Sequence, residues 1–162
     1  MTRRRTELFE FTAEDPKDVV AHMDRLAEVH DGWINLHPEV RPEDEPPQPS
    51  GFSLLVAGVS HDVPVATWVP GKQGRDGLRL DSIGVQHAAG ARVLTRLSSA
   101  GVGLPEGWRI VQDHPRRGLI VAPAPETSHR AMLDWLLEAA SVLSSVRLTG
   151  EWHAEVYLPA AM

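Results

Sequence analysis

The stretch Trp108–Val121, WRIVQDHPRRGLIV, constrains the fold of this chain more than any other. Two apolar runs of strand-forming residues flank a short polar turn that is built around Pro115. Proline presets the backbone of a turn, and Gly118 gives the chain freedom where the second run begins. Two short strands joined by a tight turn can only pair antiparallel. The stretch therefore predicts a β-hairpin inside an antiparallel sheet.

Hydrophobic patterns elsewhere extend this sheet and add helices. Glu151–Leu158 alternates apolar and polar side chains, which is the pattern of a half-buried strand. Further strand-like runs are Trp33–His37, Phe52–Val59, Pro64–Val69 and Leu78–Val85. Apolar residues at helical spacing predict three helices, over Pro16–His30, Ala88–Ala100 and from Thr127 or Ser128 to Leu143. The prediction is an α+β fold, a mainly antiparallel sheet of about six or seven strands with three helices, chiefly on one face.

Two of these helices are preceded by residues that suit a helix start. Asp15 is expected to cap the first helix, with Pro16 at its first position. Thr127 or Ser128 is expected to cap the third. These boundaries follow from local sequence alone.

The chain is predicted to be one domain spanning residues 1–162, because this length suits a single hydrophobic core. Residues 1–12 are expected to form a partly ordered N-terminal arm. Residues 41–50, RPEDEPPQPS, hold four prolines and three acidic residues and predict an exposed loop without regular structure.

The charge of the chain argues against nucleic acid and anionic membranes as partners. The formal net charge is −6, and binding to either of these needs a basic surface. No apolar run is long enough to cross a bilayer, and none follows Arg3–Arg5 as a secretory signal would require. The expected location is therefore the cytoplasm. Only Lys17 and Lys72 are lysines among 16 basic residues, a bias that suggests a bacterial source.

The polar turn of the predicted hairpin holds the candidate site. In the functional hypothesis Asp113 orients His114 as a general acid or base, and Arg116 and Arg117 hold an anionic group. In the structural alternative, the same residues serve a tight turn, with Asp113 accepting local backbone hydrogen bonds. Both hypotheses remain open at the level of sequence.

Two neighbouring features could complete such a site. Gln86 and His87 end a strand-like run just before a predicted helix, where ligands often bind. His87 belongs to a catalytic site only if it folds back beside His114. Trp108 begins a strand, so its ring could reach a binding surface, although tryptophan more often lies in the core.

Other chemistry has no sequence signature here. The eight histidines show no HxH, HxxxH or HExxH spacing, so no metal is expected. The chain has no cysteine, no GxSxG nucleophile turn and no phosphate-binding loop followed by a helix. No cofactor is therefore expected.

The leading hypothesis is a non-enzymatic binding or adaptor module that recognises a protein or a small anionic ligand. Its binding residues would be Arg116, Arg117, Gln86 and Trp108. The alternative is a small hydrolase- or transferase-type enzyme that uses His114, Asp113 and His87. A further alternative is a structural subunit of a larger assembly, including a homo-oligomer.

Overall fold

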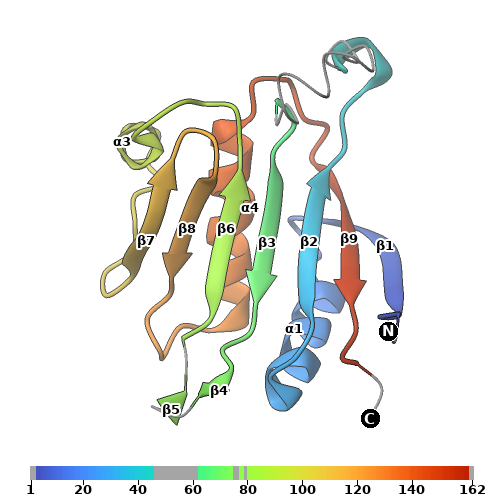
Figure 1. The fold of residues 1–162 in the computed structure, drawn as a ribbon. Helices are drawn as coiled ribbons and strands as arrows, with labels where there is room; N and C mark the ends of the chain where they lie inside the picture. Colours follow the sequence, from blue (N-terminus) through green and yellow to red (C-terminus); the bar gives the residue numbers. More distant parts are fainter. Residues whose placement is uncertain (1–2, 46–61, 75–76, 79, 161–162) are drawn as a thin grey trace.

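The computed structural model describes residues 3–45, 62–74, 77–78 and 80–160. Within them a seven-stranded antiparallel sheet has the order β1-β9-β2-β3-β6-β8-β7 (Figure 1). Its strands are β1 (Thr6–Thr12), β2 (Trp33–Pro38), β3 (Val65–Val69), β6 (Ser82–Gln86), β7 (Arg109–His114), β8 (Gly118–Ala122) and β9 (Glu151–Tyr157). A separate short hairpin consists of β4 (Gln73–Gly74) and β5 (Gly77–Leu78).

The described helices are α1 (Lys17–Val29), α3 (Val93–Ser99) and α4 (His129–Leu143), with a short 3-10 helix η1 (Pro42–Asp44). Figure 1 shows α1 and α4 behind the same face of the sheet, and α3 at the upper end beside β7. The predicted α+β class, the mainly antiparallel sheet and the three helices are confirmed. No helix in the described part of the chain is long and apolar enough to cross a membrane.

The core lies between the sheet and the helices α1 and α4. Alternate residues of β9 point into it, and Trp152, Ala154 and Val156 are at most 2% exposed. The apolar side of α4 packs against this layer with a stripe of buried residues that runs from Met132 to Leu143. Burial of these side chains from water is the main force that holds the layers together.

The N-terminal segment differs from the predicted arm. Residues Thr6–Thr12 form an edge strand that pairs with β9 along its whole length. Phe11 anchors it, because its ring is 7% exposed and stacks on Trp152 with 6.5 Å between ring centroids. Leu8 faces outward and is 74% exposed, so the segment shows no clear amphipathic pattern by itself.

Helix starts also differ in part from prediction. Asp15 does not cap α1, because Pro16 occupies the cap position without a side-chain hydrogen bond. The second helix begins at Val93 and not at Ala88, since Arg92 has a left-handed backbone that is incompatible with a preceding turn of helix. Ser128 caps α4 as predicted, accepting a hydrogen bond from the Ala131 backbone N–H over 3.1 Å.

Two predicted segments lie wholly or partly outside the described residues. Phe52–Val59, predicted to be a strand, lies outside the described residues. Of the predicted loop 41–50, the structure describes residues 41–45, where Pro42–Asp44 form the single 3-10 turn η1. Proline suits the start of such a turn, which the expectation of fully irregular backbone missed.

Candidate functional site

The β7–β8 turn does not form the predicted Asp–His pair. Asp113 and His114 are neighbours on a strand and therefore point to opposite faces of the sheet. Asp113 lies opposite the buried Leu119, and its Oδ1 accepts a hydrogen bond of 3.4 Å from the Val93 backbone N–H. The carboxylate thus contacts the first turn of α3 instead of the imidazole, which the predicted catalytic role required.

His114 is engaged by its own turn. Its Nδ1 accepts hydrogen bonds of 3.1 Å from the backbone N–H groups of both Arg116 and Arg117. An accepting Nδ1 carries no proton, so the neutral ring is protonated at Nε2. The imidazole therefore holds the turn in shape. The local backbone hydrogen bonds that the structural alternative expected at Asp113 are made by His114 instead.

Two glutamines fix the same turn from the sheet side. Gln86 and Gln112 donate side-chain hydrogen bonds of 3.2 and 2.9 Å to the Arg117 carbonyl. The turn also approaches β6 closely at Gly118, where an added Cβ would lie 2.7 Å from the Val85 carbonyl oxygen. Gln86, which the sequence offered as a binding residue, thus contacts the turn. Gln112 makes an equivalent hydrogen bond, which the sequence did not indicate because its local pattern is that of an ordinary strand residue.

His87 and Trp108 are buried. The His87 ring is 4% exposed, and its Nδ1 accepts a hydrogen bond of 3.1 Å from the Ala89 backbone N–H. Trp108 is 9% exposed and packs edge-on against Trp135, with 5.3 Å between ring centroids. The interpretation of Trp108 as a surface anchor is therefore wrong, because its ring belongs to the core.

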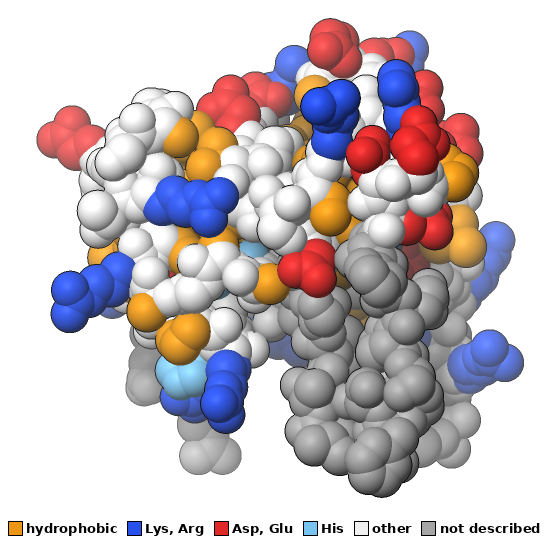
Figure 2. Space-filling model, turned by 90° about the horizontal axis from the view of Figure 1, so that it is seen from above, with side chains coloured by type: hydrophobic (Ala, Val, Ile, Leu, Met, Phe, Trp, Pro, Cys, Tyr) orange, Lys and Arg blue, Asp and Glu red, His pale blue; other side chains and the backbone are white. Residues whose placement is uncertain are grey.

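Four exposed arginines lie at this end of the molecule, two on the turn and two at α3. Arg116 and Arg117 are exposed and form no ion pair with any described residue. Arg92 and Arg96 are also exposed and lie at α3, whose first backbone N–H bonds to Asp113. Figure 2 shows basic side chains over this α3 and β7–β8 end, with most acidic side chains elsewhere in the view. These four arginines are called the arginine corner below.

Exposed apolar side chains continue from the turn along β7. Ile110 and Val111 are 56% and 60% exposed on this edge strand. The strand register shifts between Ile110 and Gln112, so Val111 has no partner residue on β8. Such a bulge turns side chains out of the regular pleat. The sequence predicted a strand here, but the local pattern could not show that β7 lies at the edge of the sheet.

Neither a metal-binding cluster in the described residues nor similarity to a known protein identifies a further site. Within the described ranges, no group of three or more His, Asp or Glu side chains is arranged to hold a metal ion. No protein-family model matches the chain, and comparisons with curated proteins and with solved structures also find no match.

Proposed function

We propose that this protein is a binding module that recognises an acidic surface of a partner protein through its arginine corner. The observation that carries the proposal is the state of Arg116 and Arg117. Both are exposed and lack an ion pair within the described residues. Their turn is nevertheless held by hydrogen bonds that His114 Nδ1 accepts and that Gln86 and Gln112 donate.

A turn ordered in advance favours binding for an entropic reason. Ordering a flexible loop on association costs free energy. A turn that is already ordered before binding avoids this cost. Arginine is also enriched at protein interfaces, since its planar guanidinium can donate two parallel hydrogen bonds to one carboxylate. The pair Arg116 and Arg117 therefore suits partner carboxylates more than a structural role in this chain.

The surroundings favour a protein over a small anion or a nucleic acid. Ile110 and Val111 offer exposed apolar surface on the strand that leads into the turn. The buried centre of a protein interface is more apolar than its rim and is enriched in arginine. The net charge of −6 opposes a polyanion that spreads beyond the corner.

The enzyme hypothesis has less support. It required Asp113, His114 and His87 to act together on a substrate. Asp113 instead bonds to the backbone of α3, and the His114 Nδ1 is occupied by two backbone N–H groups. The buried His87 ring offers little surface to a substrate.

The test compares two doubly substituted variants with the wild type. Arg116→Ala with Arg117→Ala removes the two turn arginines. The control, Arg3→Ala with Arg25→Ala, removes two other exposed arginines and changes the net charge equally. Proteins captured from lysate are identified, purified and titrated against each variant by calorimetry.

The expected result is an acidic partner whose dissociation constant rises at least about tenfold for the turn variant, equal to about 1.4 kcal/mol, and changes little for the control. Binding should also weaken with salt, because exposed charges are screened. Equal affinity for both variants, or a partner without an acidic surface, would contradict the proposal.

A further inference from the structure

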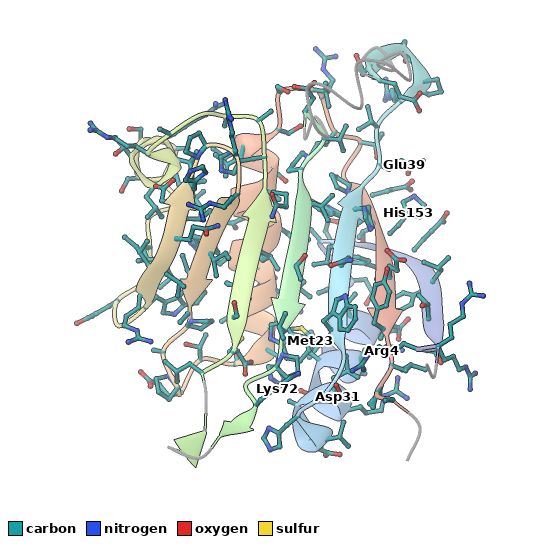
Figure 3. All side chains as sticks on the ribbon, in the orientation of Figure 1. Arg4, Met23, Asp31, Glu39, Lys72 and His153 are labelled. Atoms are coloured by element: carbon teal, nitrogen blue, oxygen red, sulfur yellow. The ribbon has the colours of Figure 1, made fainter. Side chains whose placement is uncertain are left out.

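A cavity of about 260 Å³ lies at the opposite end of the molecule from the arginine corner. It is enclosed by the end of α1, the start of α4 and the segments before β4 and after β5, at the lower end of the view in Figure 1. Lys72, labelled in Figure 3, follows the cavity residue Gly71. The residues that line the cavity include His30, Gly71, Leu80, Asp81, His129 and Met132.

Two histidines line this cavity, and both carry a proton on Nδ1. The His30 Nδ1 lies 2.8 Å from the Gly71 carbonyl oxygen, and the His129 Nδ1 lies 2.6 Å from Asp24 Oδ1. A carbonyl or carboxylate oxygen can only accept, so each Nδ1 must donate. In the neutral rings each Nε2 is then a hydrogen-bond acceptor.

Asp81 adds a negative charge to these acceptors. Its side chain is only 19% exposed, and its oxygens accept hydrogen bonds from the Gly71 backbone N–H at 2.8 Å and Trp68 Nε1 at 3.1 Å. A carboxylate has about four acceptor sites, so about two remain unused. In the described part of the chain, the one side-chain nitrogen of a Lys, Arg or His within 4 Å of its oxygens is His129 Nε2, at 3.8 Å, which is beyond hydrogen-bond reach and carries no charge in the neutral ring.

Among the residues that the structure describes, no lysine or arginine lines the cavity. A part-buried carboxylate without a close cation is costly, because a charge removed from water needs a partner. Here the carboxylate is joined by two imidazole acceptors, and Asp24 adds further negative charge behind His129. The site therefore has a negative, hydrogen-bond-accepting character, opposite to that of the arginine corner.

We propose that this cavity binds a small organic ammonium ion. The ammonium group would pair with Asp81 and donate to the Nε2 atoms of His30 and His129. Leu80, Met132 and neighbouring proline and alanine side chains offer apolar contact to a short hydrocarbon body. The volume lies just below the range of about 300–1,000 Å³ that is usual for drug-sized ligands, so the ligand is small.

The test uses three probes of similar shape and different charge. Benzylamine is cationic, benzyl alcohol neutral and benzoate anionic, and each is titrated into the intact protein while backbone amide NMR signals are recorded. Benzylamine should shift the signals of Gly71, Asp81 and His129 in a saturable way, with a dissociation constant on the order of 1 mM. Benzyl alcohol should bind at least about tenfold more weakly, and benzoate should not bind. Equal binding of the three probes, or no saturable shift with benzylamine, would overturn the proposal.

Variants place the probe within the cavity. Asp81→Asn should weaken benzylamine binding at least about tenfold, since it removes the charge. His30→Asn should also weaken it, and asparagine tolerates the left-handed backbone observed at His30. His153→Asn is the control, because His153 lies on β9 away from the cavity (Figure 3), and its affinity should match the wild type. If Asp81→Asn does not fold, His30→Asn and the three probes still decide, and unchanged binding by His30→Asn would contradict the assignment.

Discussion

Asp31 connects segments near the two ends of the chain. Its replacement should make the free energy of unfolding less sensitive to a fall in pH. Arg4 donates a hydrogen bond of 2.9 Å to its Oδ1, and the Gly32 and Ala160 backbone N–H groups donate over 2.8 and 3.1 Å. Arg4 also donates to the Leu158 carbonyl over 3.1 Å. Figure 3 shows Arg4 and Asp31 at the lower end of the sheet. The carboxylate therefore joins the strand β1, the start of β2 and the segment after β9.

The size of the effect follows from the pKa of Asp31. The Arg4 hydrogen bond, helped by the two backbone N–H groups, lowers this pKa from 3.8 to about 2. Such a shift corresponds to about 2 kcal/mol of folding free energy. The side chain is 30% exposed, so solvent screening reduces the contribution to about 1–2 kcal/mol.

The sign is set by the lowered pKa. Because the folded protein holds the ionised form, the contribution is complete above pH 3.8 and is lost as the pH falls toward 2. Asp31→Asn removes the charge at every pH. At pH 6 the free energy of unfolding of the variant should therefore be about 1–2 kcal/mol lower than that of the wild type. This difference should narrow toward pH 2.

Urea unfolding of both proteins at several pH values between 2 and 6 measures this gap. The difference between the two proteins isolates Asp31, because the other carboxylates titrate in both. Arg4→Gln and the double variant complete a mutant cycle, in which the two substitutions should be less than additive. A gap that stays constant from pH 6 to pH 2, or full additivity in the cycle, would refute the reasoning.

Substitutions at three further positions test the turn, the core and a helix cap by urea unfolding. Gly118→Ala should destabilise by at least about 1 kcal/mol, because φ is +86° and the new Cβ would lie 2.7 Å from the Val85 carbonyl; a neutral result would show that the turn relaxes easily. Trp108→Ala should cost about 3–5 kcal/mol, since the ring packs on Trp135 in the core, and a loss below about 1 kcal/mol would mean that the ring is dispensable. Ser128→Ala should cost about 1 kcal/mol through the lost α4 cap, whereas Ser128→Asp should restore it.

Local sequence accounted for much of the secondary structure. Pro115 and Gly118 predict the β7–β8 turn, and the alternation of Glu151–Leu158 predicts the strand observed at Glu151–Tyr157. Ser128 predicts the start of α4. These features depend on residues close together in the chain, so backbone sterics and periodicity suffice to find them.

Only the tertiary structure shows which strands are neighbours in the sheet. β1 pairs with β9, although Phe11 and Trp152 are far apart in the sequence. Ile110 and Val111 are exposed because β7 is at the sheet edge. An apolar residue has the same local pattern in an edge strand and in a central one, so only the strand order distinguishes these cases.

The two candidate sites show the same division. The local sequence predicts that Arg116 and Arg117 lie on a turn. The tertiary structure alone decided that Asp113 faces α3 instead of His114, and that His30, Asp81 and His129 line one cavity. The physical reason is that turn chemistry acts between adjacent residues, whereas the meeting of distant side chains depends on how the helices and the sheet pack around a shared core.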